Sequence, residues 1–192
     1  MTGVQTCALP IWPEYVCHRI WNELQLNQVL IAQGVSENIL PLMQALVIGR
    51  LVSPGSELHT WYWANHRSAL YEFTGPALRP SLSSLYRVGD RLFDCKDALE
   101  SHLAAREKDL FDLPERICLF DLTNTYFEGQ MHANAKAKRG RSKEKRSDCK
   151  LLTLALVIDE LGFAKYSRLY PGNQSEGKTD RKSTRLNSSH YS

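Results

Sequence analysis

The hydrophobic pattern of the chain changes its period near Leu113 and Pro114, and this change limits the possible folds more than any other feature. Before it, apolar residues recur at the spacing of amphipathic helices. After it, apolar and polar residues alternate or form short apolar runs, as in strands. The sequence therefore predicts an α+β fold, in which a helical region of about one hundred residues precedes the start of a sheet.

Five helices are predicted before the change, from apolar spacing and from residues that begin or end helices. They cover residues 13–33, 39–52, 56–67, 81–93 and 95–111. Pro13 suits a first helical position, and Gly34 suits a helix end. Ser36 and Ser56 are predicted to be N-caps.

Three strands are predicted after the change. RICLFDLTNTYFEG (116–129) places Asp121, Thr123 and Thr125 at alternate positions, and therefore on one face. LLTLALVID (151–159) is a continuous apolar run, typical of a buried strand, and FAKYSRLYPGN (163–173) returns after a hairpin turn. The segment between the first two strands lacks apolar periodicity and is predicted to be a loop.

The two ends of the chain fit neither pattern, but they are related to each other as nucleic acid. With one allowed codon per residue of DRKSTRLNSSH (180–190), the reverse complement translates as Val-Thr-Gly-Val-Gln-Thr-Cys-Ala-Leu-Pro-Ile. With its first codon, GTG, read as a start codon, this string matches residues 1–11 at all eleven positions. The string also resembles the adapter ligated to fragments for short-read sequencing. We therefore expect residues 1–11 and 180–192 to be adapter-derived artefacts, with a natural basic tail as the alternative.

If so, residues 12–179 belong to a protein that extends in both directions.

The charge of residues 12–179 is nearly balanced: the whole chain has 24 basic and 21 acidic residues, and the tail holds three of the basic ones and one acidic one. Eight basic and two acidic residues, however, fall within residues 136–150. This concentration suits phosphate contacts, although a solvated loop is the usual explanation of an isolated charge run. The candidate binding residues are Lys136, Lys138, Arg139, Arg141, Lys143, Lys145 and Arg146.

Other features exclude some classes of protein. No apolar run is long enough to span a bilayer. The cysteines outside the terminal segments have no C-x-x-C pair, so neither a zinc site nor a disulfide framework is indicated. Free thiols in a reducing cytosol are expected instead. The histidines have no metal-ligand spacing, and the tryptophans at 61 and 63 are predicted to pack a helix.

Asp121 is the first candidate for chemistry. It follows an apolar run in mid-strand, where a carboxylate is costly to bury unless it is paired or bound to a metal. A strand also supplies the rigidity with which Mg²⁺ needs its carboxylate ligands held. The spacing alone leaves open, and slightly favours, a strand-end aspartate that caps a turn or pairs with an arginine. Glu128 and Asp159 also lie near strand ends, and Asp159 is predicted to be a turn residue.

The order of these motifs resembles that of insertion-sequence DNA transposases of the Asp-Asp-Glu type, in the insertion-sequence-four-like group. FDLTNTYFEG (120–129) resembles their first catalytic strand, and GRSKEKRSD (140–148) is similar to the lysine-rich loop that follows it. LALVID (154–159) and YPGNQSE (170–176) look like the next hairpin. The resemblance is specific over residues 117–179, whereas over residues 12–113 it rests on helical character and position.

The resemblance implies a ribonuclease-H-like catalytic domain over residues 116–179, after a helical DNA-binding or dimerisation region over residues 12–115. It implies metal-dependent cleavage and transfer of DNA strands, with Mg²⁺ or Mn²⁺ held by two aspartates and a glutamate. Asp121 matches the first of these ligands, and the basic loop would hold the DNA backbone. The implied partners are transposon ends, target DNA and a second copy of the chain, in a prokaryotic cytoplasm and on the nucleoid when bound to DNA.

The second aspartate and the glutamate would lie beyond residue 179, because Asp159 matches the family's hairpin turn. We expect the chain as given to be inactive, since one carboxylate cannot hold two metals. The incomplete sheet is expected to expose an apolar face and an unpaired edge. The alternatives are a non-enzymatic DNA-binding protein that uses loop 136–150, a metal-dependent nuclease of the same fold, and a globular domain with a mobile charged loop.

Overall fold

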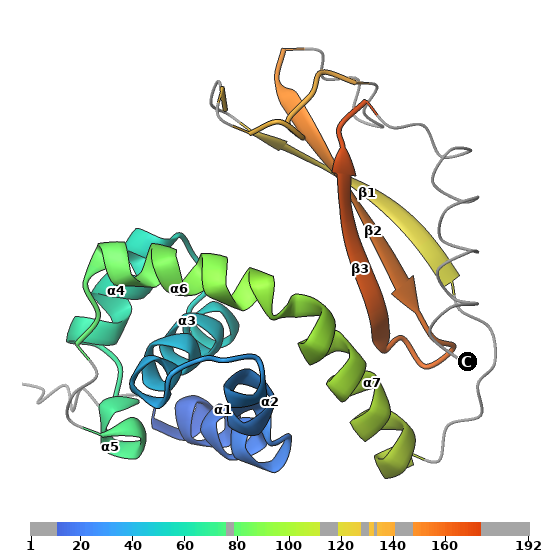
Figure 1. The fold of residues 1–192 in the computed structure, drawn as a ribbon. Coiled ribbons are helices and arrows are strands. Elements are labelled where there is room, and N and C mark those ends of the chain that lie inside the picture. The colour runs from blue at the N-terminus through green and yellow to red at the C-terminus, as the bar shows by residue number, and fades with distance from the viewer. Residues whose placement is uncertain are drawn as a thin grey trace, which may run out of the picture. The chain divides into compact units, whose positions relative to one another are not determined.

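The chain folds into two compact units, one up to Leu110 and one from Phe111 onward, as seen in a computed structural model. The structure describes residues 11–75, 79–111, 119–127, 131–132, 134–140 and 148–173. These residues form seven α-helices, one short 3-10 helix and a three-stranded antiparallel sheet, which confirms the predicted α+β class (Figure 1). The boundary between the units lies close to the change of period in the sequence.

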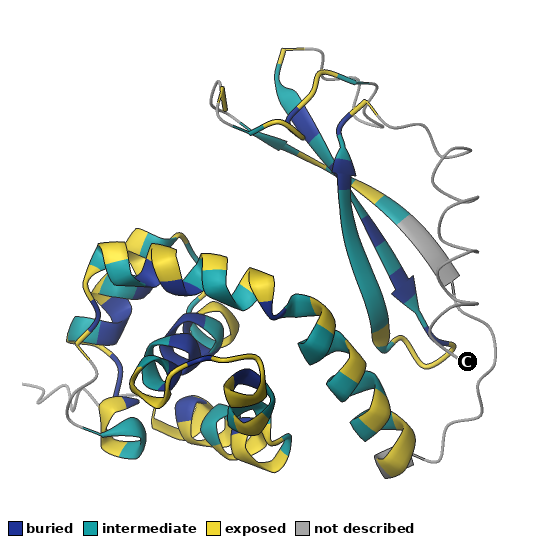
Figure 2. Ribbon diagram, in the orientation of Figure 1, coloured by how far each residue is buried: buried dark blue, intermediate teal, exposed yellow. Residues whose placement is uncertain are grey.

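The first unit is a helical bundle built around its most apolar helix, α3. Its elements are α1 (Ile11–Glu23), α2 (Leu26–Ala32), the 3-10 helix η1 (Glu37–Ile39), α3 (Leu40–Val52), α4 (Glu57–His66), α5 (Tyr71–Thr74), α6 (Leu82–Asp94) and α7 (Lys96–Phe111). Helix α3 contacts α1, α4 and α6, and Figure 2 shows buried residues along it. Met43 of α3 packs into one core with Leu30 and Leu85, and Ile48 packs into a second core with Trp63.

The first predicted helix is not continuous, because it is interrupted at Gln25. This residue adopts a left-handed conformation, with φ of 57°, between α1 and α2. The backbone carbonyls left free at the break accept hydrogen bonds from side chains of α7. Arg106 Nη2 donates to Glu23 at 3.0 Å, and His102 Nε2 donates to Leu24 at 2.7 Å. These donors lie 83 and 78 residues further along the chain, so local spacing cannot reveal the break.

Two of the predicted helix ends are confirmed in detail. Gly34 ends α2 in the left-handed region, with φ of 77°, and the N–H groups of Gly34 and Val35 close a Schellman pair of hydrogen bonds onto α2. Ser56 caps α4, since its Oγ accepts a hydrogen bond from the His59 N–H at 3.2 Å. Ser36 occupies the N-cap position of η1, as predicted, but its side chain makes no capping hydrogen bond.

The second unit holds the three predicted strands, β1 (Leu119–Phe127), β2 (Lys150–Ile158) and β3 (Ala164–Pro171), in the order β1-β2-β3. Both neighbouring pairs are antiparallel. Along the central strand β2, buried residues alternate with half-buried ones. The apolar run is therefore a strand, as predicted, but only one of its faces is fully buried.

Within the described ranges, no single helix combines the length and apolar composition that crossing a membrane requires. Residues 37–52 and 57–66 reach that composition only when taken together, across a bend of 101°.

Candidate nucleic-acid interface

Asp121, Thr123 and Thr125 stand at alternate backbone positions of β1, the spacing from which the sequence predicts one shared face. Backbone pairing sets Asp121 opposite Leu156 of β2, and the two threonines follow at alternate positions of β1. Alternate residues of a strand share a face. Thr123 and Thr125 are exposed, and the leucines of β2 opposite these three positions are half-buried. This face of the sheet is therefore the less buried one.

Asp159 holds the hairpin turn between β2 and β3, as predicted. Its Oδ1 accepts hydrogen bonds from the N–H groups of Leu161 at 3.0 Å and Phe163 at 2.9 Å, and its Oδ2 pairs with Lys165 Nζ at 3.1 Å. Burial on its own raises the pKa of this carboxyl. The two N–H donors and the Lys165 ammonium outweigh burial and hold the pKa below its ordinary value. The Asp159 carboxylate is therefore engaged by the turn.

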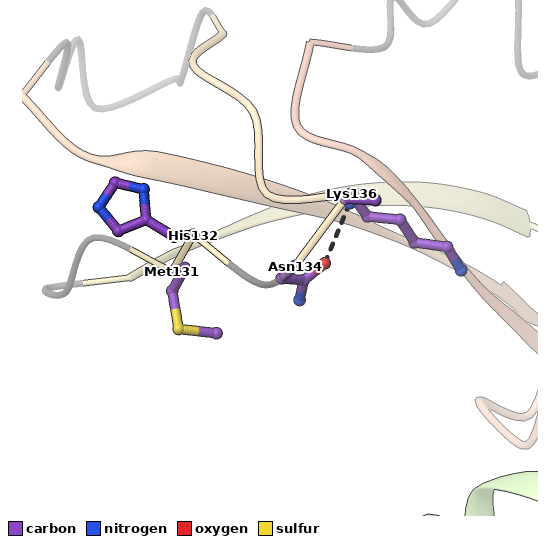
Figure 3. A pocket seen from close by; sticks show the side chains of 5 residues that line it. Met131, His132, Asn134 and Lys136 are labelled. Carbon is purple, nitrogen blue, oxygen red and sulfur yellow. Dashed lines mark hydrogen bonds between the residues drawn. The ribbon is translucent and has the colours of Figure 1, made fainter.

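The beginning of the basic segment is a loop, as predicted, but an isolated β-bridge that was not predicted fixes this loop to the sheet. Lys138 forms a β-bridge with Leu151: its N–H donates to the Leu151 carbonyl at 3.1 Å, and the Leu151 N–H donates back at 2.8 Å. The Gly172 N–H donates to the Lys136 carbonyl at 3.2 Å. Asn134 Oδ1 accepts a hydrogen bond from the Lys136 N–H at 3.0 Å (Figure 3).

Residues 134–140, which we call the platform, present cations from this fixed backbone. Lys136, Lys138 and Arg139 are exposed, whereas Ala137 between them is 3% exposed. Figure 3 shows the Lys136 side chain extending away from Asn134. The other predicted binding residues, Arg141, Lys143, Lys145 and Arg146, lie outside the described residues.

The platform and Asp121 lie toward opposite ends of the sheet. Leu151, the partner of the platform, pairs with Tyr126 of β1, which is five positions from Asp121. At a strand rise of about 3.3 Å per residue, this is a separation of roughly 17 Å along β1. Duplex DNA carries one phosphate charge per about 1.7 Å of its axis, so roughly ten phosphate charges fall within such a length.

A hollow of about 550 Å³ borders the platform. It is lined by Met131, His132, Asn134, Ala135 and Lys136 (Figure 3). Lys150 Nζ donates to the Met131 carbonyl at 3.5 Å, and this contact joins residues 131–132 to the first residue of β2. The residues that line the hollow lie close together in the chain and form no motif, so the hollow could not be predicted from the sequence.

The described residues do not form the two-metal site that the resemblance implies. No group of three His, Cys, Asp or Glu side chains comes together among them to hold a metal. Asp159 is engaged by its turn, and Glu128 lies outside the described residues. Asp121 is the one carboxylic acid residue within β1, and the register sets its backbone opposite Leu156.

Sequence reasoning missed Glu14, a fully buried carboxylate in α1. Its Oε2 accepts hydrogen bonds from Ser68 Oγ at 2.8 Å and from the Ala69 N–H at 2.9 Å. Burial raises the pKa of Glu14, aided by Glu72 and opposed by these hydrogen bonds, and the net direction is upward. The contact ties α1 to the segment before α5. The sequence near Glu14 gave no signal, because an acid in a first helical turn is ordinary.

Comparisons with protein-family models, with curated proteins and with solved structures found no match to this chain. They therefore neither support nor oppose the resemblance to transposases.

Proposed function

We propose that the chain is part of a DNA transposase of the Asp-Asp-Glu type, and that it carries the first catalytic strand and part of the surface that binds the DNA backbone. The observation that supports this most is the shared sheet. Its register places Asp121 toward one end of β1, and the platform is fixed at the other end. Phosphoryl transfer on DNA uses both kinds of group, a rigidly held carboxylate for a metal and cations for phosphates.

The arrangement of the strands supports a ribonuclease-H-like catalytic domain. Three antiparallel strands follow one another in the order β1-β2-β3, with Asp121 on the first. The helical unit that precedes them is proposed to bind DNA or a second copy of the chain. The substrates are proposed to be transposon ends and target DNA.

Mg²⁺ or Mn²⁺ belongs to this proposal only for a complete site. Asp121 would supply one ligand, and the described residues do not supply the others. Allowed codons for residues 180–190 are the reverse complement of codons for residues 1–11, with the first read as a start codon. This relation supports a protein that continues past residue 179, where the remaining carboxylates are proposed to lie. The chain as given is therefore proposed to bind DNA without cleaving it.

Binding to a labelled DNA duplex tests the DNA-contact part of the proposal. Fluorescence anisotropy at several salt concentrations gives the slope of log K against log [salt]. Replacing Lys136, Lys138 and Arg139 together with alanine should reduce that slope by about 2.7, because each lost phosphate contact contributes about 0.9. The matched control exchanges lysine and arginine at these positions and keeps the charge, so it should keep the slope. An unchanged slope in the alanine variant would contradict DNA binding by the platform.

A non-enzymatic DNA-binding protein is the second candidate, and the platform favours it equally, because phosphate contacts need no catalytic carboxylate. Asp121→Asn in the complete protein separates the two candidates. In a transposase this substitution should abolish strand cleavage and leave DNA affinity largely unchanged. Loss of DNA affinity would instead assign Asp121 a structural role.

A further inference from the structure

Two glycines lie where the platform crosses the end of the sheet. Gly140 ends the platform, and Gly172 directly follows β3. A Cβ atom on Gly140 would overlap the carbonyl oxygen of Gly172, and a Cβ atom on Gly172 would overlap the carbonyl oxygen of Leu151. Each obstacle is backbone, which cannot swing aside as the end of a side chain can. Only residues without a side chain let these three backbones approach so closely.

Hydrogen bonds join the same three segments. The Gly172 N–H donates to the Lys136 carbonyl at 3.2 Å, and Lys138 exchanges two hydrogen bonds with Leu151. Ala137, between the two lysines, is buried. The backbone that carries the platform's cations is therefore fixed by β2 and by the end of β3, and these contacts depend on the approach that the two glycines allow.

We propose that Gly140 and Gly172 are positioning residues for binding of the DNA backbone. Their contact, which we call the glycine crossing, holds Lys136, Lys138 and Arg139 ready for phosphate oxygens. A free loop would lose conformational entropy when it bound, and the crossing removes that cost in advance. This inference rests on the proposed function and deepens it, because it assigns the affinity for phosphates to the part of the basic segment whose backbone is held in place before DNA binds.

The test uses Gly140→Ala and Gly172→Ala in the full chain, with two other glycine-to-alanine variants as matched controls. Gly162 lies in the hairpin turn at the other end of the sheet with φ of 88°, so Gly162→Ala strains the backbone away from the crossing. Gly89 lies in α6, where a new Cβ would meet Leu46 at an ordinary 3.6 Å. Thermal unfolding of each variant sets a temperature at which all of them are folded.

DNA affinity and its salt slope are then measured for the four variants by anisotropy. The two crossing variants should lose affinity by about tenfold at ~0.1 M salt and lower the slope by about one or more. The two controls should leave both quantities unchanged. A loss of affinity confined to the crossing variants then could not come from a general loss of stability. If the alanine variant of the three cations lowers the slope but the crossing variants keep it, the positioning role is wrong and the proposed function stands. If the alanine variant also keeps the slope, both fail.

Amide hydrogen exchange of the unsubstituted chain keeps the inference testable if a crossing variant does not fold. The amides of Lys138, Leu151 and Gly172 should exchange much more slowly than in an unfolded peptide, because each donates across the crossing. Exchange of the Lys138 and Gly172 amides at the rate of an unfolded peptide would overturn the inference, since such a backbone does not hold its cations in place.

Discussion

The contact between α3 and α4 depends on a glycine, and Gly49→Ala should destabilise the helical unit. A Cβ atom at Gly49 would lie 2.9 Å from Thr60 Cγ2 and 3.0 Å from the Trp63 ring, closer than ordinary van der Waals contact. Both neighbours are buried, Thr60 at 0% exposure and Trp63 at 4%, so neither can move into solvent. Inserting a methyl group into such a contact costs about 1–3 kcal/mol.

Alanine also favours a helix over glycine by about 0.8–1.0 kcal/mol, so the overlap is partly offset. The net effect of Gly49→Ala is then a destabilisation of up to roughly 2 kcal/mol. Gly89→Ala in α6 is the matched control, because its Cβ would meet Leu46 at 3.6 Å without overlap. It should gain the helix propensity alone and raise stability by about 0.8–1.0 kcal/mol. The difference between the two variants isolates the overlap.

Thermal unfolding followed by circular dichroism at 222 nm measures this difference. For a unit of this size, 1 kcal/mol shifts Tm by about 4–8 °C, so Gly49→Ala should unfold at least several degrees below Gly89→Ala. Equal stabilisation by both substitutions would refute the reasoning, because α3 and α4 would then not pack as closely as the structure has them.

Three further substitutions test contacts elsewhere. Because the pKa of Glu14 is raised in the folded chain, its contribution to stability is full below the ordinary pKa of 4.5 and is lost as pH rises through the folded pKa. Glu14→Gln should remove this loss in denaturant titrations at a series of pH values. The pKa of Asp159 is lowered, so its contribution is present above 3.8 and is lost as pH falls through the folded pKa; Asp159→Asn should remove this acid-side loss, measured by hydrogen exchange of the hairpin amides. Ser56→Ala should lower the free energy of unfolding of the helical unit by about 1 kcal/mol through loss of the α4 cap, as chemical denaturation would show.

The correct predictions from sequence concern features that neighbouring residues decide. The change of period predicts the order of helices and strands, because burial of one face selects the spacing of apolar residues. Gly34 ends α2 because a left-handed residue suits glycine, and Asp159 makes a turn because its carboxylate reaches N–H groups two and four residues later. These interactions join residues that are close in the chain, so they can be predicted from the sequence alone.

The failures concern partners that are distant in the chain. The break at Gln25 is supported by donors of α7, and Glu14 is held by Ser68, which lies 54 residues away. The platform is a loop, as the absence of apolar periodicity predicted, but its attachment to the sheet was not predicted. This attachment comes from backbone hydrogen bonds and from close approach at Gly172, which leave no periodic pattern in the sequence.

Sequencing the source DNA outward from the codons of Trp12 and Thr179 tests the proposed transposase most directly. We predict that the reading frame continues past Thr179, reaches another aspartate at a strand and then a glutamate in a helix, and that the codons for residues 1–11 and 180–192 are absent. A source genome that itself encodes DRKSTRLNSSH and ends the protein two residues later would contradict the proposal. The protein would then carry a single candidate carboxylate, and DNA binding without catalysis would be the better description.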